Sequence, residues 1–89
     1  MESIHQFASG VLAEMLRRQP ASKERTDFAW QLAVGPALAR ATTVELRDGV
    51  LFVVARDERW RAEIARAQGV ILAKLQHLLG AEAVHRIRT

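Results

Sequence analysis

Tryptophan and arginine are the residue types in this chain best suited to binding a partner, because they dominate the binding energy of protein interfaces. Three arginines lie within four positions of Trp60: Arg56, Arg59 and Arg61. Acidic residues are interspersed among them, so two interpretations fit. The segment is either an ordinary solvated helix face laced with ion pairs, or a surface on which Trp60 serves as an exposed anchor. Trp60 itself fits the edge of a core and an exposed anchor equally well.

A second basic group lies nearer the N-terminus, in a polar joint that spans residues 17–25. It comprises Arg17, Arg18, Lys23 and Arg25, with Glu24 as the sole acid among them. Arg86 and Arg88 alternate in the last predicted strand and therefore point to one side of it. These six residues are the candidates for contact with nucleic-acid phosphates, which would give affinity without base-reading specificity.

Residues with the spacing of a catalytic or metal site are missing from the sequence. The three histidines, His5, His77 and His85, are isolated from one another, and the five glycines are too dispersed for a phosphate-binding loop. The chain has no cysteine, which excludes disulfides, thiolate metal sites and thiol catalysis. We therefore predict a protein that is not an enzyme and that uses no cofactor, metal or small-molecule substrate.

The bulk composition is that of a soluble globular protein. The chain has 89 residues, of which 49% are hydrophobic and 26% charged, so residues 1–89 are expected to form a single domain. A net charge of +3 permits contact with nucleic acid without requiring it. The N-terminus lacks the pattern of a signal peptide, and no apolar run is long enough to span a membrane. We expect a cytoplasmic protein without membrane contact.

A β-hairpin is the strongest structural signal in the sequence. Asp48-Gly49 suits a type I′ turn, which requires positive φ at both central positions. Residues 42–47 before the turn alternate between apolar and polar, which is typical of a half-exposed strand. Residues 50–55 after the turn are apolar at every position, so this strand is predicted to be central, with both faces covered.

Two helices are predicted before the hairpin. A capping box at Ser3–Gln6 begins the first, which should fray before Pro20. Its buried face is formed by Ile4, Phe7, Val11, Leu12, Met15 and Leu16. The second helix is expected to begin near Thr26 or Asp27 and to be kinked, or broken and restarted, at Gly35-Pro36. Its apolar side is formed by Phe28, Leu32 and Leu38 with Ala29, Ala33 and Ala39, while Trp30 is assigned to the core.

After the hairpin, Asp57 is predicted to cap a helical stretch that runs to Leu79 and ends at Gly80. Gly69 leaves two possibilities, one kinked helix or two helices joined at Gln68-Gly69. Residues 83–88 form a last short strand, which the helical crossover should bring parallel to the central strand. The fold class is therefore α+β, with the order α-α-β-β-α(α)-β and a three-stranded sheet packed against helices.

An ordered set of positions along nearly the whole chain resembles the DciA family. The set comprises Trp30, Val34, Gly35, Leu38, Ala39, Asp48, Gly49, Leu51, Val53, Arg59, Trp60, Glu63, Ile64, Ile71, Leu72, Leu75, Leu78, Leu79, Gly80, Val84 and Ile87. The resemblance implies a KH-like domain of type II order that binds the replicative DNA helicase of bacteria, assists its loading and carries out no catalysis. It also implies contact with DNA, single-stranded or branched. The chain lacks the GxxG loop with which KH domains clamp a nucleic-acid backbone, so we expect only weak, non-specific DNA binding.

Three functional hypotheses follow. The first is a helicase-binding replication protein that uses Trp60 with Arg56, Arg59 and Arg61. The second is a KH-like module that binds RNA or single-stranded DNA without a helicase partner. The third is a structural adaptor or homodimer with neither partner.

Overall fold

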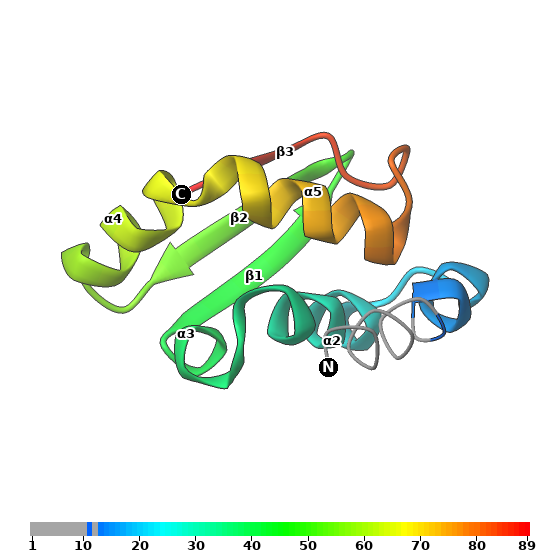
Figure 1. Cartoon of the computed structure of the whole chain (residues 1–89), viewed down its shortest axis with the longest axis horizontal. Coiled ribbons are helices and arrows are strands. Elements are labelled where there is room, and N and C mark those ends of the chain that lie inside the picture. Colours follow the sequence, from blue (N-terminus) through cyan, green and yellow to red (C-terminus); the bar gives the residue numbers. More distant parts are fainter. Residues whose placement is uncertain (1–10, 12) are drawn as a thin grey trace, which may run out of the picture.

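The computed structural model describes residue 11 and residues 13–89, which form a layer of helices on one side of a three-stranded sheet (Figure 1). Residues 13–18 are helical. The elements that follow are α2 (Lys23–Val34), α3 (Pro36–Arg40), β1 (Thr42–Arg47), β2 (Val50–Ala55), α4 (Glu58–Arg66), α5 (Gln68–Leu79) and β3 (Arg86–Arg88). This order confirms the predicted α+β fold class, and it is compatible with the KH-like arrangement that the resemblance implies.

The sheet has the order β1-β2-β3, with β2 in the centre as predicted. β1 and β2 pair antiparallel through the predicted turn, where Asp48 and Gly49 have φ values of 51° and 80°. Both values are positive, as a type I′ turn requires. β3 pairs parallel with β2, which confirms the expected result of the helical crossover.

Among the described residues, helices cover only one face of β2. Leu51 and Val53 are 1% and 4% exposed and belong to the core, whereas Val54 is 67% exposed. The prediction that both faces are covered was wrong. An unbroken apolar run is usual for strands between two helical layers, but here α2, α4 and α5 all pack on the same side, as Figure 1 shows.

The second helix begins earlier than predicted. The Ser22 hydroxyl accepts a hydrogen bond from the Arg25 N–H and caps α2, so Lys23 rather than Thr26 or Asp27 opens the helix. Trp30 is 2% exposed, which confirms its place in the core. Gly35, with a φ of 91°, breaks the helix, and Pro36 starts α3 at the first helical position, where proline is tolerated.

The apolar faces predicted for the first two helices are only partly buried. In the first helix Leu16 is 4% exposed, but Val11 and Met15 are 44% and 53% exposed. In α2 the small residues Ala29 and Ala33 are buried with Trp30, while two larger residues point outward, Phe28 and Leu32. The predicted capping box at Ser3–Gln6 lies outside the described residues, as do Ile4, Phe7 and Leu12.

The helical stretch after the hairpin consists of two helices. Asp57 caps α4 as predicted, because its carboxylate accepts a hydrogen bond from the Trp60 N–H at 3.1 Å. α4 ends at Arg66, and α5 begins at Gln68, so the joint lies at Ala67 and Gly69 is already helical. The last strand is shorter than predicted and comprises Arg86–Arg88 alone.

Candidate functional site

Trp60 lies in the first turn of α4, shortly after the end of β2. Its position in the first turn of α4 is fixed by the Asp57 cap, and its side chain is neither buried nor fully exposed. By contrast, the indole of Trp30 is buried and donates a hydrogen bond to the Thr42 hydroxyl at 2.8 Å. Trp60 is therefore only partly buried and keeps part of its surface accessible to a partner.

The three predicted arginines around Trp60 are all exposed, and one of them, Arg61, forms an ion pair with a described residue. Arg61 binds Glu58 through two contacts of 2.5 and 3.0 Å, and this hydrogen-bonded carboxylate raises the pKa of the guanidinium. Arg56 donates to the Arg40 carbonyl at 3.2 Å. No described carboxylate lies within ion-pair distance of Arg59. The structure thus leaves Arg59 available beside Trp60.

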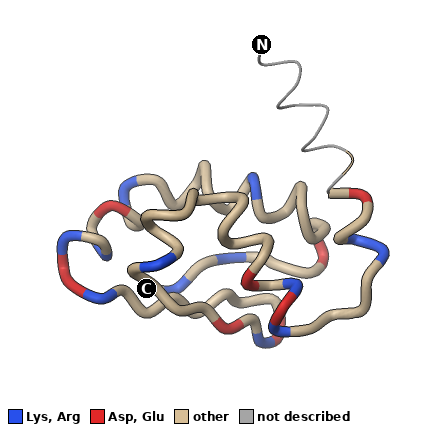
Figure 2. The backbone as a smooth tube through the Cα atoms, turned by 90° about the horizontal axis from the view of Figure 1, so that it is seen from below, with Lys and Arg blue, Asp and Glu red and all other residues tan. Residues whose placement is uncertain are grey.

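Charges of both signs alternate along the α4 end of the molecule, as Figure 2 shows. The Glu63–Arg66 ion pair, at 2.8 Å, continues this pattern along α4. Exposed pairs of this kind contribute only about 0.3–0.5 kcal/mol each. Part of the segment is therefore the ordinary ion-paired helix surface that the sequence also allowed, while Arg56 and Arg59 beside Trp60 have no ion pair with a described carboxylate.

In the basic group at residues 17–25 all four cations lie on helices, with the non-helical residues 19–22 between them. Arg18 and Lys23 form exposed i,i+4 ion pairs with Glu14 and Asp27 at 2.9 and 3.1 Å. Arg17 donates to the His77 carbonyl in the last turn of α5. These three cations remain exposed, so their contact with phosphates stays a prediction.

Arg25 differs from the other three because it is only 8% exposed. Its guanidinium donates to the carbonyls of Leu16 and Gln19 at 3.2 and 3.0 Å, which closes the end of the first helix. Its Nε has no hydrogen-bond partner among the described atoms. The side chain is thus used inside the fold, and we leave Arg25 out of any proposed surface.

Arg86 and Arg88 both lie on the open face of the sheet, with Ile87 buried between them. This confirms that they point to one side. On β1, at the other edge of the sheet, the guanidinium carbon of Arg47 lies 4.7 Å from the centre of the Phe52 ring on β2. The pair was not anticipated from the sequence. The two-residue turn fixes the register that places Arg47 and Phe52 on one face. The sequence of the hairpin therefore contained the information needed to predict this pair.

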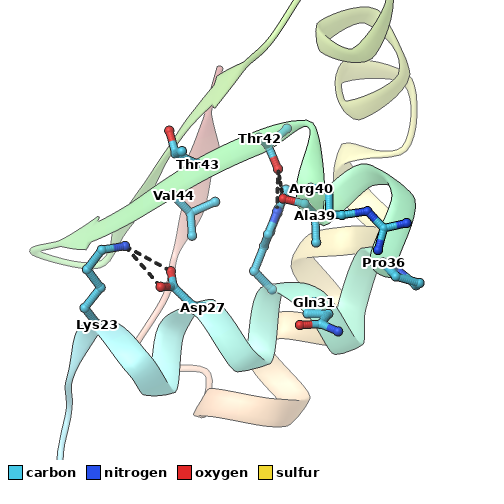
Figure 3. Close-up of a pocket in the computed structure, with 10 residues that line it drawn as sticks. Lys23, Asp27, Gln31, Pro36, Ala39, Arg40, Thr42, Thr43 and Val44 are labelled. Carbon is cyan, nitrogen blue, oxygen red and sulfur yellow. Dashed lines mark hydrogen bonds and ion pairs between the residues drawn. The ribbon is translucent and has the colours of Figure 1, made fainter.

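A groove runs between α2 and the free edge of β1 (Figure 3). One part of it is a hollow of about 400 Å³, with the Lys23–Asp27 ion pair at one end and Arg40 at the other. The walls between these ends are mainly Trp30, Gln31 and Thr43. The carboxylate that lines this hollow, Asp27, is paired with Lys23. No lining residue is a nucleophile with a general base beside it. Within residue 11 and residues 13–89, no cluster of three acidic or histidine side chains could hold a metal ion.

The comparison with protein families decides the chain's identity at the level of family. The model of the family described as "Dna[CI] antecedent, DciA" matches residues 3–89. The chain belongs to the DciA family. No curated protein and no solved structure matches the chain. Membership of the DciA family supports a role connected with DNA replication and helicase loading.

One further finding concerns membranes. No helix in the described part of the chain is both long enough and apolar enough to cross a bilayer.

Proposed function

We propose that this DciA-family chain binds the replicative DNA helicase and assists its loading onto DNA in the cytoplasm, without catalysis of its own. The observation that carries the proposal is the Trp60 surface, which consists of Trp60, Arg56, Arg59 and Arg61. A half-buried tryptophan beside an arginine without an ion pair to any described residue is the composition of an interface hot spot. Family membership supports the choice of a helicase as partner.

Helicase binding requires no chemistry in this domain, only a rigid surface. The Asp57 cap and the burial of Ile64 hold α4 against the sheet, so the Trp60 side chain is presented from a fixed element. A rigid anchor loses little conformational entropy on binding. The chain would act by holding one conformation of the helicase.

Binding of the purified chain to the cognate helicase tests this proposal by isothermal titration calorimetry. We expect Trp60→Ala to weaken the affinity by about thirtyfold or more, since hot-spot residues contribute about 2 kcal/mol or above. The matched control is Val70→Ala, which truncates an exposed apolar residue on α5, 62% exposed and outside this surface. The control variant should bind like the unmodified chain.

Thermal unfolding of the same variants separates binding from folding. Because Trp60 is only partly buried, its loss should cost clearly less than the approximately 3–5 kcal/mol of a core tryptophan. Absence of binding by the unmodified chain at micromolar concentrations would reject the helicase as partner. Equal affinity of Trp60→Ala and the unmodified chain would reject the Trp60 surface.

A second candidate function is nucleic-acid binding without a helicase partner. It is favoured by the two β3 arginines, Arg86 and Arg88, which are exposed side by side on the open face of the sheet. Such binding would weaken steeply as the salt concentration rises, because phosphate contacts release counterions.

A further inference from the structure

The open face of the sheet carries side chains in three rows that run across the strands. The first row is Arg47, Val50 and Arg86, and the second is Glu45, Phe52 and Arg88. The third row consists of Thr43 and Val54. An aromatic ring therefore lies at the centre of this open face, and arginines lie on the strands to both sides of it.

Phe52 and Arg47 form a stacked pair within this face. The guanidinium carbon lies 4.7 Å from the ring centre, and the Glu45 carboxylate lies 3.5 Å from the Arg47 Nε on the same strand. Glu45 thus helps to orient the guanidinium over the ring. An arginine backed by an aromatic ring presents a flat, positively charged surface, and guanidinium planes and aromatic rings are the surfaces on which single-stranded bases stack.

The charge of the open face is complementary to a polyanion. Three arginines (Arg47, Arg86 and Arg88) stand against one glutamate, Glu45. No described carboxylate lies within ion-pair distance of either β3 arginine. The apolar area beside them is substantial, since Val54 is 67% exposed. A flat face with unpaired arginines, an aromatic pair and exposed apolar surface fits a ligand with both phosphates and bases.

We propose that the open face of the sheet binds single-stranded nucleic acid. A base stacks on the Arg47–Phe52 pair, and Arg86 and Arg88 contact the phosphates. This inference rests on the second candidate function and names its site. The site differs from the loop clamp of KH domains, since the joint between α4 and α5 carries no GxxG sequence. Duplexes should bind more weakly, because their bases are already stacked and paired.

Fluorescence anisotropy with a labelled oligothymidylate tests the stacking contact. Phe52→Ala should weaken the affinity by about fivefold to 150-fold, the usual range for loss of one base–aromatic stack. The salt dependence should stay the same, because no charge is removed. Val70→Ala is the control, since it truncates an exposed apolar residue on α5, away from the open face of the sheet. Its affinity should equal that of the unmodified chain.

The phosphate contacts are tested by the double variant Arg86→Ala/Arg88→Ala. For single strands, each lost phosphate contact lowers the slope of log affinity against log salt by about 0.7, so the double variant should lose about 1.4. Lys74→Ala, which removes an exposed cation on α5, should leave the slope unchanged. Amide chemical shifts measured with the oligonucleotide should move on β1, β2 and β3 and not on α2.

The results of these experiments distinguish failure of the proposed site on the sheet from failure of nucleic-acid binding as such. Absence of oligothymidylate binding at low salt would overturn both. Binding with unchanged affinity for Phe52→Ala, or shifts confined to residues 17–23 and α2, would leave nucleic-acid binding in place and overturn the site on the sheet. Equal competition by polyglutamate would show a purely electrostatic surface for acidic proteins and would likewise overturn the proposal. The helicase experiment is independent of all three outcomes.

Discussion

Leu51 and Val53 on one face of β2 are 1% and 4% exposed, whereas Val54 on the other face is 67% exposed, although the strand is apolar throughout. The covered side packs against α2, α4 and α5 and contains the core. The open side carries Phe52 and Val54 among arginines. Apolar residues on the covered side are explained by burial, but those on the open side are not.

Polar groups differ between the two sides in the same way. On the covered side the Trp30 indole N–H, the Thr42 hydroxyl and the Arg25 guanidinium all donate to groups within the domain. On the open side Arg86 and Arg88 have no described ion-pair partner. Charged groups without a described ion-pair partner, such as the guanidinium groups of Arg86 and Arg88, therefore mark the open face as the candidate for a role beyond folding.

Truncating one apolar residue on each face of β2 should show the largest difference between the two sides. Leu51→Ala should lower the free energy of unfolding by about 2–5 kcal/mol, because it removes buried methyl groups and leaves a cavity. Val54→Ala should change it by no more than about 0.5 kcal/mol. Urea unfolding measures both. A similar cost for the two variants would mean that the open face is covered in solution.

The next test compares a buried arginine with an exposed one. Arg25→Ala should cost about 1.5–3 kcal/mol, since hydrogen bonds to a charged group contribute that much and the helix end at Leu16 and Gln19 loses its donor. The control is Arg18→Ala, whose exposed pair with Glu14 should contribute no more than about 0.5 kcal/mol. Thermal unfolding at one pH ranks them, and an equal cost would contradict the structural role of Arg25.

The smallest effect concerns the hydrogen bond that joins α2 to β1. Thr42→Val retains the shape of the side chain but removes the oxygen that accepts from the Trp30 Nε1 at 2.8 Å. We expect a loss of about 1–2 kcal/mol from the unsatisfied indole N–H. Thr43→Val, one position along on the exposed side, is the control and should be near neutral. If both variants are neutral, the Trp30–Thr42 bond contributes nothing to stability.

The local features of the fold could be predicted from the sequence, because each depends on a few neighbouring residues. The Asp48-Gly49 turn, the break at Gly35-Pro36 and the Asp57 cap are of this kind. The start of α2 was misplaced because three capping residues compete there, and Ser22 is the one whose hydroxyl reaches the helix.

The features that depend on which elements meet could not be predicted. The apolar run of β2 does not say how many helical layers cover it, so the open face was missed. Arg25 reads as one more surface cation, and only the approach of the first helix buries it. For the candidate site, the positions of Trp60, Arg86 and Arg88 could be anticipated, and the register of the Asp48-Gly49 hairpin would also have placed Arg47 and Phe52 on one face.

The parallel strand β3 has a consequence for the order of folding. β1 and β2 are joined by a two-residue turn, so their pairing closes a very short loop. Val50 and Arg86, by contrast, are 86 − 50 = 36 positions apart, and each doubling of loop length adds about 0.6 kcal/mol to the entropic cost of closure. We therefore expect the hairpin to form before β3 docks. The arginines of β3 reach the open face only after the far end of the chain has docked, so that face is complete only in the fully folded domain.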